Sequence, residues 1–296
     1  MDNDQTLDIV VHTTNHNLDP NRYPIKKRVD LADDLYIDVL PTDLAQKILE
    51  ACEPKGYLYN HVLQFGQLYS FVRKNPPKVD GLGWDEDQHL QLCLALSRLI
   101  HPTSISMEYA VRIFLTSDDN LRQIVPAQAS GLSSQAFVID TNLNCLTEID
   151  AENLKQLIAA FDKVPFKDPL LRAMWYHEYA ARFYEIDLRW TLISTGIEVI
   201  VHTDRFKSTK QFVERVQKLS DAVGVGTITK KQAEDMYEFR SSLAHGQGIG
   251  GLTTEKMELY KMMEEILRLT IRKSILDESF HNLLSDPDQI RKIWPV

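Results

Sequence analysis

The C-terminal half of the chain is organised around the segment Tyr237-Glu-Phe-Arg240-Ser241-Ser-Leu-Ala-His245-Gly246. This segment predicts a helix that ends where a glycine-rich run begins at Gly246. An arginine is a permanently charged, fork-shaped donor that fits a phosphate, and a histidine can take up and release a proton near neutral pH. An arginine and a histidine are together sufficient for cleaving RNA without a metal ion.

The spacing of Arg240 and His245 works against a site on one straight helix. Five residues at about 100° per residue place the two side chains roughly 140° apart. A loosened last turn, or a second copy of the helix across a two-fold axis, would bring them together. The alternative is that Arg240 forms a surface ion pair with Glu238 or Asp235, while His245 is favoured by the dipole at the helix C-terminus.

The C-terminal half resembles the HEPN superfamily, specifically its ApeA-like branch, over about residues 168–290. The similarity rests on three stretches: 189–200, 206–216 and 237–246. The mark of this branch is an Arg followed, after four to six residues, by a His near the end of one helix of a compact bundle, as in Arg240 and His245. Many members have Asn or Asp directly after the Arg. This chain has Ser241 there, which can still form hydrogen bonds.

The resemblance implies a metal-independent endoribonuclease that acts as a homodimer, with Arg240 and His245 as catalytic residues in a cleft between two bundles. Tyr237, Ser241 and Glu198 are the expected supporting residues. The resemblance further implies an RNA substrate, a toxin or antiviral defence role and an antitoxin or regulatory partner, which in some relatives is a nucleotidyltransferase. The alternative is a non-catalytic interaction or nucleotide-binding module that keeps the bundle.

Glu198 stands within an otherwise apolar stretch that runs from Thr191 to Val201. An unpaired charge buried in such a stretch costs several kcal/mol, so the side chain should be exposed, paired or functional. We expect Glu198 to pair with Arg240 or to orient His245. The alternative is that it faces solvent.

The charge of the chain is unevenly distributed. Residues 1–165 contain 14 Lys and Arg against 23 Asp and Glu, whereas residues 166–296 contain 19 of each, so the net charge of −9 belongs to the N-terminal half. Within 204–218 the basic residues outnumber Asp204 and Glu214 and could contact RNA phosphates, or simply form a solvated helix face. They are Arg205, Lys207, Lys210, Arg215 and Lys218.

We expect two domains: an acidic α+β domain at 1–165 with a sensor or regulatory role, and an all-α bundle at 166–296, so that the chain is mainly α overall. In the first domain, strands are predicted at 7–12, 35–40, 57–65, 109–115 and 136–139. Helices are predicted at 41–51, 85–100 and 151–161, the second with Leu90, Cys93, Leu94 and Leu99 on one face. Pro165 and Pro169 place the domain boundary at 163–169.

The second domain is predicted to be helical throughout. A long helix should run from about Leu170 to His202, with a possible break near Gly196. Capping boxes predict helix starts at Ser208, with Gln211, and at Thr229, with Gln232. A further helix should follow Thr253 or Thr254, and a short C-terminal helix after Pro287 should pack through Ile290, Ile293 and Trp294.

The sequence indicates no cofactor and no metal site. The glycines at 224–226 and 246–251 lack the spacing of a phosphate-binding or dinucleotide-binding loop, so we interpret them as connections between helices. His12 with His16, and His177 with Glu178, lack the further ligands that a metal needs. The three cysteines Cys52, Cys93 and Cys145 fit reduced thiols, and the chain shows no signal peptide or membrane span, so we expect a cytoplasmic protein.

Overall fold

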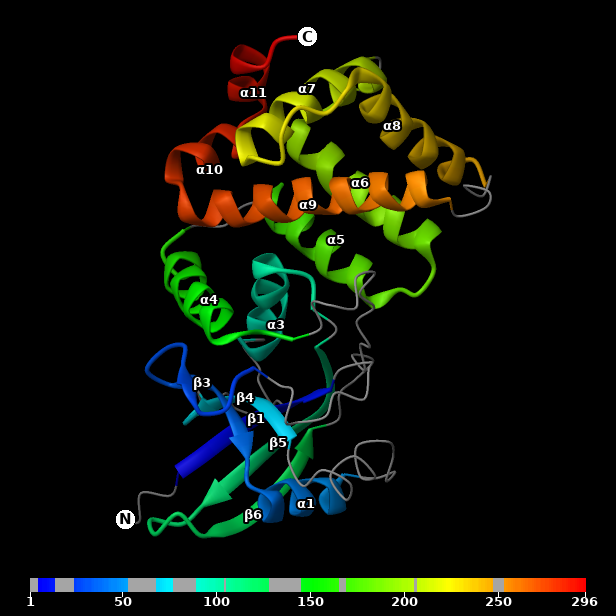
Figure 1. The fold of residues 1–296 in the computed structure, drawn as a ribbon. Helices are drawn as coiled ribbons and strands as arrows, with labels where there is room; N and C mark the ends of the chain where they lie inside the picture. The colour runs from blue at the N-terminus through cyan, green and yellow to red at the C-terminus, as the bar shows by residue number, and fades with distance from the viewer. Residues whose placement is uncertain are drawn as a thin grey trace. The chain divides into compact units, whose positions relative to one another are not determined.

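The computed structural model divides the chain into two compact units, residues 1–159 and 160–296 (Figure 1). The division falls in the last turns of a helix, ahead of the boundary expected from the prolines. The structure describes residues 5–13, 24–52, 68–76, 89–103, 105–127, 145–164, 169–204, 207–246 and 253–296.

The first unit contains a six-stranded antiparallel sheet in the order β2-β3-β4-β1-β5-β6. Its strands are β1 (Gln5–Thr13), β2 (Val29–Asp30), β3 (Leu35–Leu40), β4 (Leu68–Lys74), β5 (Ser106–Leu115) and β6 (Leu121–Ala127). The predicted strands at 7–12, 35–40 and 109–115 are confirmed within β1, β3 and β5. Those predicted at 57–65 and 136–139 lie outside the described residues.

Side chains alternate between the two faces of the sheet, as a strand period of two requires. Leu7 and Ile9 on β1 join a core under helix α1 (Thr42–Ala51), which buries Ala45, Ile48 and Leu49. Asp8 lies on the opposite face with no exposed side-chain surface, where Arg112 of β5 donates two hydrogen bonds to it at 2.6 and 2.8 Å. A buried carboxylate is tolerated there because a bidentate guanidinium compensates its charge.

Two further helices of this unit are α3 (His89–Ile100) and α4 (Glu148–Phe161). Leu90, Cys93, Leu94 and Leu99, which were predicted to share one face of the first helix, are all buried. Every residue from Cys93 to Ile100 is buried as well, so the second half of this helix is buried on all sides. Residues 85–88, which we predicted to open this helix, lie outside the described residues.

Burial raises the pKa of the Cys52 thiol, which follows α1, to about 11. The thiol therefore stays protonated and unreactive at neutral pH.

The second unit consists of helices α5 to α11 (Figure 1). They are α5 (Leu170–Arg182), α6 (Ile186–Val201), α7 (Ser208–Val223), α8 (Lys230–Ala244), α9 (Thr254–Leu276), α10 (Glu278–Ser285) and α11 (Pro287–Ile293). Trp190 of α6 lies at the centre with no exposed surface. Its ring packs edge-on against Phe239 and tilted against Tyr260, and its indole N–H donates to the carbonyl of Met236. This side chain therefore joins α6, α8 and α9 in one core.

The structure corrects the long helix predicted from Leu170 to His202. The helix is interrupted after Arg182 and resumes at Ile186, whereas Gly196 lies inside α6. A Cβ atom at Gly196 would lie 2.8 Å from the Cδ2 atom of Leu267 on α9. The glycine therefore permits close helix packing and does not break the helix.

The helix ends agree with the predicted caps in part. The capping box of Thr229 and Gln232 is confirmed, and Thr253 caps α9. The box predicted at Ser208 is wrong, because Lys207 is the N-cap of α7 and makes no side-chain capping bond. The predicted partner, Gln211, instead donates to the Asp204 carboxylate and accepts from its backbone N–H.

The C-terminal helix α11 packs through only part of its predicted apolar set. Ile290 is fully buried and Trp294 is 9% exposed, whereas Ile293 is 52% exposed. The helix spans only Pro287–Ile293, so it presents one narrow face to the bundle and Ile293 lies outside that face.

No helix in the described part of the chain is long and apolar enough to cross a membrane.

Candidate functional site

Helix α8 positions the two predicted catalytic residues at its C-terminal end. Arg240 lies in its second-last turn, and His245 is the residue that ends it. Both hydrogen bonds of the Thr229–Gln232 capping box are present at the other end, which fixes where the helix starts. The position of Arg240 and His245 relative to the helix end therefore follows from local sequence.

Arg240 is held by Glu198 of α6. A terminal N–H of the guanidinium donates to Glu198 Oε2 at 2.6 Å, which confirms the predicted pairing. The other carboxylate oxygen accepts from the Thr203 hydroxyl at 3.2 Å. The side chains are 29% exposed for Arg240 and 18% for Glu198, so solvent and ligands can still reach the guanidinium. A partly exposed pair of this kind stabilises the fold by only about 1 kcal/mol, because water screens it.

Tyr237 supports Arg240 from one turn earlier on the same helix. Its hydroxyl shares a hydrogen bond of 2.8 Å with Ser208 of α7, and its ring packs against Phe212 with 5.3 Å between centroids. The Arg240 guanidinium carbon lies 6.0 Å from the centroid of the Tyr237 ring, at the limit of a cation–π contact. Tyr237 thus anchors α8 to α7 and borders the guanidinium.

His245 ends α8 in a loosened turn. Its backbone N–H donates to both Ser241 O and Ser242 O at 3.1 Å, and Gly246 follows in the left-handed conformation with a φ of 75°. The imidazole is exposed and makes no hydrogen bond or ion pair within the described residues. The backbone carbonyl of Ser241 therefore accepts a hydrogen bond at the end of the helix. Among the described residues of one copy of the chain, the side chains of His245 and Arg240 form no hydrogen bond with each other.

The predicted RNA-binding stripe on α7 is corrected at Arg215. This side chain is buried, and it donates to the carbonyls of Val201, His202 and Trp294. Burial lowers the pKa of the Arg215 guanidinium, although an arginine keeps its charge. Arg215 ties α7 to the end of α6 and to the C-terminus, so it cannot contact a phosphate.

The other basic residues of the stripe differ in exposure. Lys207 is exposed, and Lys210 is 67% exposed and lies 3.7 Å from Glu214. Lys218 donates to the carbonyl of Pro295 at 3.3 Å. Arg205 lies outside the described residues. Two exposed lysines are thus the described members of the stripe that remain available to a ligand.

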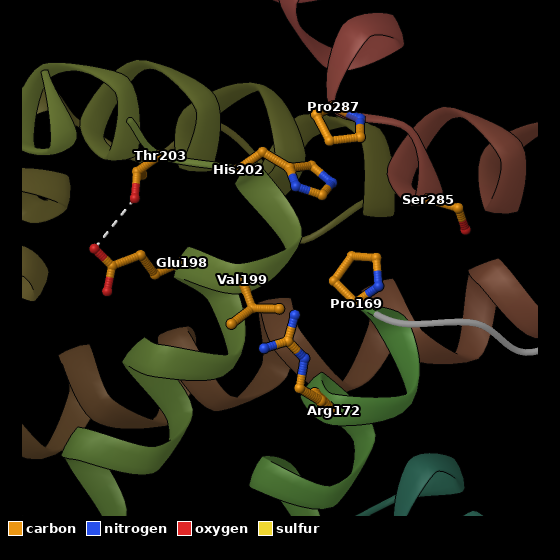
Figure 2. Close-up of a pocket in the computed structure, with 8 residues that line it drawn as sticks. All are labelled: Pro169, Arg172, Glu198, Val199, His202, Thr203, Ser285 and Pro287. Carbon is orange, nitrogen blue, oxygen red and sulfur yellow. Dashed lines mark hydrogen bonds between the residues drawn. The ribbon is translucent and has the colours of Figure 1, made fainter. Parts of the chain in front are cut away.

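A surface pocket that the sequence did not reveal lies beside Glu198 (Figure 2). Its volume is about 520 Å³. Its apolar lining comes from Pro169, Val199 and Pro287, and Arg172 and His202 add polar groups. No motif marks this pocket, because its residues come from three separate segments of the chain.

His202 is the most unusual residue of this pocket. It ends α6 in the left-handed conformation, with φ 51° and ψ 63°, which is uncommon for a residue other than glycine. Its Nε2 lies 2.9 Å from the Leu284 carbonyl. Burial lowers the pKa of the imidazole against the opposing effect of that hydrogen bond, so the ring is mainly neutral at pH 7.

The described residues contain no group of three or more His, Cys, Asp or Glu side chains that could hold a metal ion. His177 Nε2 lies 2.7 Å from Glu264 Oε1 and so takes part in an internal hydrogen bond. His12 belongs to β1, but its side chain and the whole of His16 lie outside the described residues.

No protein-family model, curated protein or solved structure matches this chain.

Proposed function

We propose that the protein is a metal-independent endoribonuclease of the HEPN type. The observation that carries this proposal is the anchoring of Arg240 by Glu198, at 2.6 Å, five residues before an exposed histidine at the end of the same helix. The arrangement supports phosphate chemistry because the Glu198 contact uses one terminal nitrogen of the guanidinium and leaves other N–H groups for a phosphate.

In the proposed reaction, His245 accepts the proton of a ribose 2′-hydroxyl. The 2′-oxygen attacks the adjacent phosphorus, and Arg240 stabilises the negative charge that builds up on the phosphoryl oxygens. The bond from phosphorus to the 5′-oxygen then breaks, and an imidazolium returns the proton to that oxygen. The products are a 2′,3′-cyclic phosphate and a 5′-hydroxyl. DNA is spared because it lacks the attacking hydroxyl.

We further propose that two copies of the chain form the cleft. One copy leaves His245 without a contact to Arg240 among the described residues, and a two-fold axis would supply two histidines, one as base and one as acid. An apolar surface at the turn between α5 and α6 supports pairing, because such patches mark protein interfaces. Its exposed members are Tyr179, Phe183, Tyr184 and Leu188.

We also propose that the protein acts in toxicity or antiviral defence. In this proposal residues 1–165 regulate the activity, and an antitoxin is the partner.

The test incubates the full chain with total RNA in the presence of EDTA, alongside His245→Ala and Arg240→Ala. Lys230→Ala is the matched control, because it removes an exposed cation from the first turn of the same helix. We expect cleavage by the wild type and by Lys230→Ala, with ends that carry a cyclic phosphate, and at least a 100-fold loss in the other two variants. Equal cleavage by all four proteins, or cleavage only after metal is added, would refute the mechanism.

A further inference from the structure

A second pocket lies within the first unit, where the segment 27–30 meets helix α4. Its volume is about 500 Å³, which falls within the range of roughly 300–1,000 Å³ that is typical of small-molecule sites. The segment 27–30, which includes strand β2, forms one part of its lining. The first turns of α4 form the other part, through Glu148, Ile149, Glu152 and Lys155. All of these residues belong to the unit at 1–159, and none of them takes part in the proposed cleavage of RNA.

Arg28 is a cation held in a fixed position in the lining of this pocket. Its guanidinium carbon lies 3.8 Å from the centroid of the Tyr36 ring, which is buried and so forms a rigid platform. Asp30 Oδ1 accepts from Nε of Arg28 at 2.7 Å and lies 2.5 Å from one terminal nitrogen. The N–H groups of the other terminal nitrogen remain for a carboxylate, and the side chain is 38% exposed.

The part of the lining that α4 contributes carries charges of both signs. Glu148, Glu152 and Lys155 are separated by four and three residues, so they lie on one face of the helix. At about 1.5 Å per residue, the two glutamates lie roughly 10.5 and 4.5 Å from Lys155 along the helix axis. These three side chains and Lys27 form no ion pair with each other or with any other part of the chain that the structure describes. Their charges are therefore left for a ligand that itself carries both signs.

Strand β2 is an edge of the sheet. Among the described strands it pairs only with β3, through Val29 with Ile37 and Asp30 with Tyr36. Successive residues of an antiparallel strand point their backbone N–H and C=O groups alternately toward and away from the neighbouring strand. One of Val29 and Asp30 therefore presents both groups at the open edge, where an extended peptide can add. Val29 and Ile149, which is 75% exposed, supply apolar surface to the same pocket.

We infer that this pocket binds a short peptide of two or three residues with free ends. Its backbone pairs with the edge of β2, its terminal carboxylate lies on the Arg28 guanidinium, and its terminal ammonium lies at Glu148 and Glu152. A chain spans at most about 3.3–3.6 Å per residue, so two or three residues cover roughly 7–11 Å, which matches the separation of the charges on α4. A peptide ligand of this kind gives chemical content to the sensor role expected of residues 1–165.

Titration calorimetry on the full chain tests this inference. The main probe is the dipeptide Leu-Leu with free ends, because its side chains suit an apolar surface. Four related probes each lack one feature. N-acetyl-Leu-Leu lacks the ammonium, Leu-Leu-amide lacks the carboxylate, Leu-N-methyl-Leu lacks the amide N–H, and free leucine lacks the peptide bond. The tripeptide Leu-Leu-Leu distinguishes the two lengths.

The protein variants remove one set of charges at a time. Arg28→Gln removes the guanidinium, and a second variant combines Glu148→Gln with Glu152→Gln. Lys47→Ala and Glu50→Gln are the matched controls, because these charges lie on α1 and do not line the pocket. All five side chains are exposed, so every variant should fold like the wild type.

We expect the free dipeptide or tripeptide to bind at least 10-fold more tightly than the two capped peptides, because each cap removes a charge-assisted hydrogen bond. Free leucine and the N-methyl peptide should also bind more weakly. Arg28→Gln should weaken binding of the free peptide about 10-fold and leave binding of Leu-Leu-amide unchanged, because that probe already lacks the carboxylate. By the same reasoning, the double glutamine variant should leave binding of N-acetyl-Leu-Leu unchanged.

Three results would overturn the inference. They are absence of binding by every probe, capped peptides that bind as tightly as the free ones, and pocket variants that bind like Lys47→Ala and Glu50→Gln. Equal binding of the N-methyl peptide or of free leucine would refute pairing with the edge of β2. Absence of RNA cleavage by the wild type would refute the proposed function alone, since these binding measurements do not depend on cleavage.

Discussion

Each unit of the molecule contains an arginine–carboxylate pair between distant elements, and the two pairs are built differently. In the sheet, Arg112 donates to both oxygens of Asp8, whose side chain has no exposed surface. In the bundle, Arg240 reaches Glu198 through one nitrogen, and both side chains remain partly exposed. A fully buried carboxylate that accepts from two guanidinium nitrogens holds two strands together. A pair that uses one guanidinium nitrogen leaves the other N–H groups of the arginine for a ligand.

The largest effect is expected from breaking the pair in the sheet. Replacing Asp8 with Ala leaves Arg112 without its buried counter-charge and should lower the free energy of unfolding of the first unit by about 3–5 kcal/mol. Hydrogen–deuterium exchange should speed up in β1 and β5, with no change in α8.

Asp30→Ala is the matched control for this variant. Its carboxylate is 60% exposed and pairs with Arg28, so the loss should stay below about 1 kcal/mol. Similar losses in the two variants would contradict the distinction between a buried carboxylate and an exposed one.

Arg240→Ala should have the opposite profile. The unfolding free energy should change by about 1 kcal/mol or less, because the pair is screened by water. RNA cleavage should fall by about 10²–10³-fold, the usual consequence of removing a group that stabilises transition-state charge. Steady-state cleavage rates and urea denaturation of one protein sample measure both quantities. A loss of stability like that of Asp8→Ala would show that Arg240 is a structural residue.

Glu198→Gln tests the carboxylate of the Arg240–Glu198 pair. The amide can still accept from Thr203, but it no longer attracts the guanidinium as an ion, so Arg240 is held less firmly. We expect cleavage to fall about 10-fold, mainly in kcat, which corresponds to about 1.4 kcal/mol. If Glu198 positions Arg240, then Glu198→Gln should cause no further loss in a protein that already carries Arg240→Ala. An independent loss in the double variant would assign Glu198 another role.

The partner of Glu198 was predictable because a charge within an apolar helix demands compensation. Arg215 obeys the same rule, since it lies three residues after Phe212 and four before Leu219 on the buried face of α7. A count of the positive charges in residues 204–218 does not show that Arg215 lies on the buried face. The helical period does, because it places Arg215 on the same face as Phe212 and Leu219. The start of α8 was likewise predictable, because a capping box is a local signal.

Other features depend on contacts between distant segments. The break after Arg182 contains no proline or glycine, so the sequence gives no local sign of it. The role of Gly196 is decided by Leu267 on another helix. The pocket beside α6 arises only once α5, α6 and the turn between α10 and α11 are assembled. These are tertiary effects that local propensity does not encode.

The smallest effect concerns His202, which lines the same pocket as Glu198. Burial lowers the pKa of this imidazole, the Leu284 hydrogen bond opposes the shift, and the charges of Arg215 and Arg291 add to it. Because its pKa is lower in the folded protein than in the unfolded chain, its contribution to stability is fully present above about pH 6.5. That contribution is lost as the pH falls through the folded-state pKa. The melting temperature of the wild type should therefore fall more steeply between pH 8 and pH 5 than that of His202→Asn, in which the remaining histidines are unchanged. If the melting temperatures of the two proteins fell in parallel with pH, the pKa of His202 would be the same in the folded and unfolded chain. The burial of the ring at the end of α6 would then have no effect on its pKa.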